Sequence, residues 1–157
     1  MDPTAADRAL RAITDSGIAF TVTEHGPVRS LEEAAAARGL TPERVLKSIV
    51  VRRAEGDHLF VLVPGGRTIS WPKLRALLAV NRLSMPSAED ALAVTGYARG
   101  TITPFGSLTD LPVIADAAVP PGPVSIGGGA HGVAFTVDSA ELVRVLDADV
   151  ADVTEAE

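Results

Sequence analysis

Two apolar runs, residues 48–53 and 58–63, lie on either side of the short sequence Ala54-Glu55-Gly56-Asp57. Strand-like runs that are separated by a short turn containing glycine are typical of a β-hairpin. Helical and extended patterns are mixed along the rest of the chain, without the regular strand–helix–strand repeat of a parallel sheet. We therefore predict an α+β fold that contains antiparallel hairpins.

Helix signals recur along the chain. Serine or threonine is suited to cap the start of a helix, and glycine is suited to end one. On this basis helices are expected from Thr4 to Gly17, from Ser30 to Gly39, from Ser70, from Ser87 to Gly96 and from Ser139. A short helix that begins at Thr41-Pro42 is expected to run into Lys47. Other extended segments are expected at residues 18–23, 97–103, 113–115, 124–126 and 133–137.

The length of 157 residues suits one domain, and no internal repeat or long linker divides the chain. We predict a single domain over residues 1–157, which ends in a short, loosely held acidic tail at residues 147–157. The first residues lack the basic and apolar regions of a signal peptide, and no apolar run is long enough to cross a membrane. A cytoplasmic protein without a membrane partner is expected.

The residue types that the chain contains or lacks exclude several kinds of chemistry. The chain has no cysteine, which excludes disulfides, thiolate metal sites and a cysteine nucleophile within it. Its three histidines lack the spacing of metal ligands, and no G-x-S-x-G sequence is present. We expect no metal and no cofactor. The net charge of −6 argues against broad coating of nucleic acid, but it allows contact with a nucleic-acid end through a local basic patch.

Lys47 lies inside the apolar run from Val45 to Val51. A charged amine is costly to bury without a partner, so this lysine needs an explanation. It could be a lysine at a helix C-terminus, where it complements the helix dipole and reaches water. It could instead be a fixed cation for a phosphate, a carboxylate or an ester oxygen.

Two glycine-rich segments also have two interpretations. Gly96, Gly100, Pro104 and Gly106 could serve only as turn and bulge residues, or they could let a ligand approach the backbone closely. The sequence from Gly127 to Gly129 lacks the Gly-Lys-Ser/Thr ending of a phosphate-binding loop, which favours a tight turn. His131, in the same turn, could be an exposed loop residue or could supply a hydrogen bond or a proton near neutral pH.

Three motifs in order resemble the YbaK/EbsC family, whose members are related to the editing domain that is inserted in bacterial prolyl-tRNA synthetases. The motifs are Val45-Leu-Lys-Ser-Ile-Val-Val51, Thr95-Gly-Tyr-x-x-Gly-x-Ile-x-Pro-x-Gly106 and Gly128-Gly-x-x-Gly132. The resemblance implies a mixed, mostly antiparallel, barrel-like sheet flanked by helices. It also implies hydrolysis of mischarged aminoacyl-tRNA in trans, with the tRNA acceptor end as partner and an aminoacyl-tRNA synthetase as a possible one.

The resemblance assigns roles to particular residues. It implies that Lys47 and His131 are catalytic. The implied substrate-binding residues are Thr23, Ser48, Gly100, Thr101, Ile102, Thr103, Pro104, Gly128 and Gly129. The cysteine-clearing branch is similar but looks different at Thr23, Gly127 and Ala130-His131, so a small amino acid such as alanine, serine or threonine is the expected substrate. The alternative is a non-catalytic module that binds an amino acid, a nucleotide or a synthetase.

Overall fold

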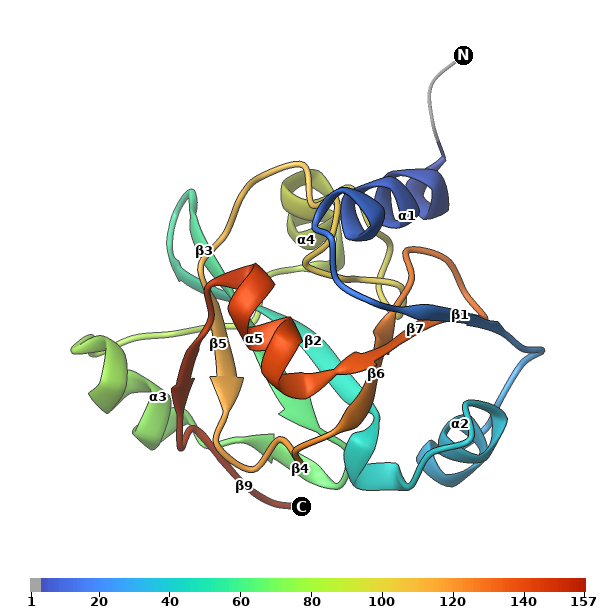
Figure 1. The fold of residues 1–157 in the computed structure, drawn as a ribbon. Helices are drawn as coiled ribbons and strands as arrows, with labels where there is room; N and C mark the ends of the chain where they lie inside the picture. The colour runs from blue at the N-terminus through green and yellow to red at the C-terminus, as the bar shows by residue number, and fades with distance from the viewer. Residues whose placement is uncertain (1–3) are drawn as a thin grey trace.

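The structure is a computed structural model that describes residues 4–157. It confirms the α+β class: helices flank three β-sheets, and four of the six strand pairs are antiparallel. The sheets are separate and do not close into one barrel (Figure 1). The helices are α1 (Ala5–Asp15), α2 (Leu31–Ala37), the 3-10 helix η1 (Pro42–Arg44), α3 (Trp71–Leu78), α4 (Ala88–Thr95) and α5 (Ser139–Leu146).

The predicted hairpin forms half of a four-stranded sheet with the order β2-β3-β5-β8. β2 and β3 are antiparallel, with Val50 opposite Phe60, whereas β5 is parallel to both β3 and β8. Because β3 is buried on both faces, its alternate side chains enter two different hydrophobic clusters. The strands are β2 (Leu46–Ala54), β3 (Asp57–Pro64), β5 (Val113–Asp116) and β8 (Asp149–Ala151).

The other two sheets are smaller. A three-stranded antiparallel sheet has the order β1-β7-β6, and a single bridge between Val45 and Ser125 connects its β6 to the start of β2. A two-stranded sheet pairs β4 with β9. Their strands are β1 (Thr21–Glu24), β6 (Pro123–Gly127), β7 (Val133–Asp138), β4 (Arg67–Ile69) and β9 (Thr154–Ala156).

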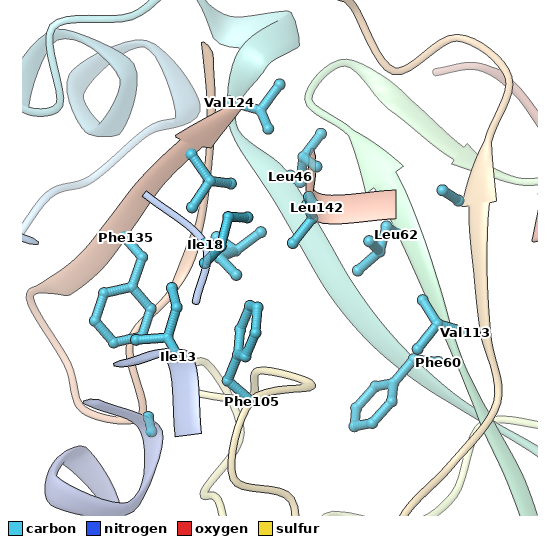
Figure 2. Packing of buried hydrophobic residues seen from close by; sticks show 14 of the residues in the cluster. Ile13, Ile18, Leu46, Phe60, Leu62, Phe105, Val113, Val124, Phe135 and Leu142 are labelled. Carbon is cyan, nitrogen blue, oxygen red and sulfur yellow. The ribbon is translucent and has the colours of Figure 1, made fainter. Parts of the chain in front are cut away.

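The larger hydrophobic cluster fills the space between the three-stranded and four-stranded sheets (Figure 2). Phe135 of β7 packs edge-on against Phe20, with ring centroids 5.7 Å apart. Ile13 from α1 and Leu142 from α5 also belong to this cluster. Aliphatic side chains provide most of this core because only 4% of the residues are aromatic.

Local capping signals predicted the helix ends well. Thr4 forms a complete capping box with Asp7 at the start of α1. α4 ends at Gly96, which has a φ of 79°. The cap of α5 was misplaced by one residue: the side chain of Asp138, and not of Ser139, accepts the N–H of Glu141.

Other expectations were wrong where distant segments decide the structure. The short helix ends at Arg44 and does not reach Lys47, because residues from Leu46 onward pair with β3. Residues 97–103 form a loop, in which a turn brings the N–H of Thr101 to the carbonyl of Ala98. The first predicted strand begins at Thr21, three residues later than expected from a start at residue 18.

The acidic C-terminal segment is not loosely held. β8 extends the four-stranded sheet and β9 pairs with β4. Val153, between these strands, is fully buried and donates its N–H to the carboxylate of Asp116. No helix within residues 4–157 is long and apolar enough to cross a membrane.

Candidate functional site

A cleft of about 340 Å³ runs along the outer edge of β2. Single bridges close this edge at its two ends, from Val45 to Ser125 and from Arg52 to Ser84, and no strand within residues 4–157 pairs with the part between them. A volume of this size is within the range of pockets that bind small molecules. The lining residues are 45–50, 85–88, Ala91, Arg99, Gly100, Ile102, Arg38 and Gly127. The cleft therefore joins residues that are far apart in the sequence.

Lys47 contributes to the wall of this cleft, but its amine is engaged elsewhere. Nζ donates a 2.7 Å hydrogen bond to the carbonyl of Arg67, and it lies 3.3 Å from a carboxylate oxygen of Glu157. Side chains alternate along a strand, so Lys47 shares its face with Ile49, which packs against the smaller hydrophobic cluster. The position is a strand, and the helix-terminus interpretation is wrong.

Ser48 lies on the opposite face of β2 from Lys47 and also lines the cleft. Its hydroxyl oxygen is buried and has no hydrogen-bond partner among the described residues. Buried polar groups without partners are uncommon in native proteins. This hydroxyl is therefore a candidate for contact with a ligand or with water.

The loop around Gly100 forms the other wall of the cleft. Gly100 has a φ of 88°, a conformation that favours glycine, and it is exposed. The N–H groups of Gly100 and Ile102 donate to no described residue, whereas that of Thr101 donates to Ala98. The loop thus presents two free backbone donors beside the cleft. The close approach of Gly127, where an added Cβ would lie 3.0 Å from the carbonyl oxygen of Ile102, fixes the loop against β6.

Thr101, Thr103 and Pro104, the other predicted binding residues of this loop, are buried or half-buried and do not line the cleft. The hydroxyl of Thr101 donates to the carbonyl of Ala98, and the hydroxyl of Thr103 accepts the N–H of Phe105. Pro104 accepts the N–H of Ser107 through its carbonyl oxygen. These contacts hold the loop in shape, and the hydroxyls of Thr101 and Thr103 are already engaged.

His131 is exposed and lies close to Gly100, although it does not line the cleft. A Cβ built on Gly100 would lie 3.3 Å from Cε1 of the His131 ring. Gly128 and Gly129 precede His131 and are buried. A Cβ on Gly129 would be 2.9 Å from the carbonyl oxygen of Ala5, so this glycine allows α1 to approach the turn. The two glycines therefore position the turn that carries His131.

Thr23, another predicted site residue, belongs to the three-stranded sheet. It lies on β1, opposite Ala134 of β7, and is half-buried. It is absent from the lining of the cleft.

Sequence reasoning did not identify Arg38, which lines the cleft at the C-terminal end of α2. Its Nη1 donates a 2.9 Å hydrogen bond to the hydroxyl of Ser125 on β6. Partial burial lowers the pKa of this guanidinium below its ordinary value. No sequence signal marks this role, because a basic residue at a helix C-terminus is a common feature of surface helices.

The described residues offer no evident metal centre. No group of three or more histidine, aspartate or glutamate side chains within residues 4–157 is arranged to hold a metal ion. The chemistry that the cleft can supply comes from cations, free backbone donors and a buried hydroxyl.

The chain matches a family model and several curated proteins. Residues 25–145 match the family described as the aminoacyl-tRNA editing domain. The proline–tRNA ligase of Pelobacter propionicus is 29% identical over 111 residues, which are 71% of this chain and 19% of the ligase. The proline–tRNA ligase of Bacillus licheniformis is 32% identical over 68% of this chain and 19% of the ligase. The chain thus spans about a fifth of the length of these curated relatives.

A solved structure matches the chain over its whole length. It is described as that of a candidate trans-editing enzyme for prolyl tRNA synthetase. It superposes with a TM-score of 0.89 at 28% identity and covers 99% of this chain and 100% of its own. The family predicted from the three sequence motifs is confirmed, and the chain belongs to the aminoacyl-tRNA editing domain family.

Proposed function

We propose that this protein hydrolyses the ester bond of mischarged aminoacyl-tRNA in trans. The observation that carries the proposal is the cleft at the outer edge of β2, which brings Lys47 and Ser48 together with the free backbone donors of the Gly100 loop. Membership of the editing family supports it. The similar structure that matches from end to end supports action in trans, since that protein is described as a trans-editing enzyme.

The proposed reaction is attack by water on the ester that joins an amino acid to the terminal adenosine. The chain has no cysteine, so no thioester forms on it. Free N–H groups of Gly100 and Ile102 would orient the ester carbonyl, and Lys47 would stabilise the negative charge that develops on its oxygen. Lys47 would first have to exchange its contact with the Arg67 carbonyl for one with the substrate. His131, beside Gly100, would hold a ribose hydroxyl or the attacking water.

A small amino acid is the proposed substrate side chain. The cleft is small and its wall includes Ile102, Met85 and Ala91, which would crowd a large side chain. Size exclusion separates side chains that differ by one methylene by only about 1–3 kcal/mol. Alanine, serine and threonine are therefore the amino acids to compare, and tRNA recognition would have to add further discrimination.

The tRNA would approach over an arginine-rich depression next to the cleft. Arg52, Arg75 and Arg82 line this depression together with Arg53, which is paired with Asp57. The segment that follows it, residues 85–88, forms part of the cleft. A local group of arginines in a chain of net charge −6 favours contact with a few phosphates at the acceptor end.

Two further basic residues, Lys73 and Arg99, lie outside this depression. Lys73 donates to Asp152 and to the carbonyl of Thr154, outside the arginine-rich depression. Arg99 is exposed and lines the cleft itself. Arg99 would therefore contact the last nucleotides of the tRNA, and Arg82 would contact the acceptor stem.

The decisive experiment is a deacylation screen over tRNAs charged with alanine, serine and threonine. Transfer RNA for proline is the first substrate to test, because the curated relatives are proline–tRNA ligases. We expect release of at least one small amino acid by the wild-type protein and none by the Lys47→Ala variant. Inactivity on every substrate, combined with saturable binding of a small ligand, would favour a non-catalytic binding module instead. The existing contact between Lys47 and Glu157 is the observation that favours this second candidate.

A footprinting experiment tests the proposed partner. Protection from nuclease should be confined to the acceptor end of the tRNA, because the basic surface is local. Protection that extends to the anticodon would contradict this part of the proposal. Binding to a prolyl-tRNA synthetase can be measured separately, since the related domain lies within that enzyme in the curated relatives.

A further inference from the structure

Arg38 is a cation that lines the cleft without a carboxylate partner among residues 4–157. Its Nη1 is held by the hydroxyl of Ser125, which is fully buried on β6. Its Nε is shielded from solvent and donates to no described residue. The Nη2 end of the guanidinium also has no described hydrogen-bond acceptor, so it is the part left to meet a ligand.

Two polar groups at the same cleft therefore lack hydrogen-bond partners among the described residues: Nε of the Arg38 guanidinium and the hydroxyl of Ser48. A partly buried charge without a counter-ion is unfavourable, and so is a buried hydroxyl without a partner. Arginine stays protonated in proteins, so burial does not remove the charge. A ligand with anionic oxygens would supply a counter-charge to the guanidinium and a hydrogen-bond acceptor to the hydroxyl.

The aminoacylated end of the proposed substrate would bring only one kind of anionic group into the cleft. The carboxyl group of its amino acid is esterified and neutral, whereas the nucleotides of the acceptor end are joined by phosphodiesters. The planar guanidinium of arginine suits two phosphate oxygens better than a lysine amine does. Moreover, the amine of Lys47 is already bound by the Arg67 carbonyl.

We propose that Arg38 binds the phosphodiester on the 5′ side of the terminal adenosine, with the hydroxyl of Ser48 as a second donor. This inference rests on the proposed function and deepens it. The sequence analysis considered only Lys47 as a cation for a phosphate or an ester oxygen. In this proposal Arg38 binds the phosphate, and Lys47 contacts the ester oxygen. Arg38 thus acts as a substrate-binding residue at the end of the cleft formed by α2 and β6.

The test compares two small probes by calorimetry. The dinucleotide cytidylyl-(3′→5′)-adenosine contains the phosphodiester in question, and adenosine lacks it. Wild-type protein should bind the dinucleotide about tenfold or more tightly than adenosine, since hydrogen bonds to a charged group are the stronger ones. Arg38→Met should abolish this preference and leave adenosine binding unchanged. Arg144→Met is the matched control, because Arg144 is exposed and paired with Glu141, and it should keep the preference.

The inference would be overturned by the absence of a preference for the dinucleotide in the wild type, or by a preference that persists in folded Arg38→Met. If the methionine variant does not fold, Arg38→Lys provides the comparison, because lysine keeps the charge and lacks the planar guanidinium. Arg38→Lys should lose most of the preference for the dinucleotide. Full retention of the preference would overturn the inference. Deacylation by a wild-type protein that shows no dinucleotide preference would refute the Arg38 assignment alone. A preference that depends on Arg38 in a protein without deacylase activity would refute the proposed function alone.

Discussion

The amine of Lys47 and the carbonyl of Arg67 are joined by a 2.7 Å hydrogen bond that connects β2 to β4. A carboxylate oxygen of Glu157 lies 3.3 Å from the same amine, next to the end of β9. The lysine that stands inside an apolar run is thus placed where three strands meet, and its side chain remains 41% exposed. Its position in the sequence reflects strand pairing, and its amine is held by the Arg67 carbonyl of β4.

Replacement of Lys47 by alanine should abolish deacylation and change the melting temperature little. The ion pair with Glu157 is largely exposed, and such pairs contribute only about 0–1 kcal/mol before screening by salt. Lys73→Ala is the matched control, because Lys73 is exposed to a similar extent and also pairs with an acid and a carbonyl oxygen. Thermal melting and single-turnover deacylation of both variants provide the measurement. Full activity of Lys47→Ala would show that the proposed mechanism is wrong.

The sequence predicted those features of the fold that neighbouring residues determine. The hairpin around Gly56 and the cap at Thr4 depend on residues within a few positions of each other, and both are present. The strand at Lys47 and the pairing of the C-terminal segment depend on distant partners, which a local pattern does not contain.

The same distinction applies to the candidate site. The motifs around Lys47 and Gly100 were evident in the sequence, and the structure brings them to one cleft. Arg38 reaches Ser125, 87 positions away, so only the folded chain reveals that it lines this cleft. Its separation from the motifs explains why sequence reasoning missed it.

Gly129→Ala should destabilise the protein more than Gly66→Ala. Both glycines have a positive φ, which costs an L-residue roughly 1–2 kcal/mol. At Gly129 a Cβ would also lie 3.0 Å from Cβ of Ala9 and 3.0 Å from the Tyr97 ring, whereas nothing lies within 4 Å at Gly66. Overpacking of this kind adds about 1–3 kcal/mol. Denaturant unfolding of the two variants measures the difference, and equal losses would contradict the close packing of α1 on this turn.

The buried ring of His58 and the carboxylate of Asp90 form a 2.8 Å contact between β3 and the first turn of α4. Asp90→Ala should destabilise the protein by about 1–3 kcal/mol, because it leaves a ring nitrogen buried without a partner. Glu89→Ala is the control, since Glu89 is exposed in the same helical turn and its loss should have a small effect. Residues next to Asp90 line the cleft, so we also expect Asp90→Ala to raise KM for deacylation. Similar stabilities of the two variants would contradict a structural role for the contact.

Tyr97 should make the stability fall at alkaline pH. Burial raises the pKa of its phenol, an effect that the nearby guanidinium of Arg8 partly opposes. Its hydroxyl donates a 2.6 Å hydrogen bond to the carbonyl of Phe105, and ionisation would remove this donor. Because the folded pKa lies above the unfolded one, the contribution to stability is complete below about pH 10 and is lost as the pH rises through the folded pKa.

Tyr97→Phe isolates this effect, because the hydroxyl is removed while the buried ring is kept. The variant should be about 1 kcal/mol less stable than the wild type at neutral pH, since the carbonyl of Phe105 loses its donor. This difference in the free energy of unfolding should shrink as the pH rises above about 10. Only the wild type has a buried phenol that must stay protonated in the folded state, so only the wild type loses stability through it. Denaturant unfolding at several pH values measures the difference, and tyrosinate absorbance reports Tyr97 directly because it is the only tyrosine of the chain. A stability difference that stays constant through the alkaline range would contradict the raised pKa and the role of burial that we derive for it.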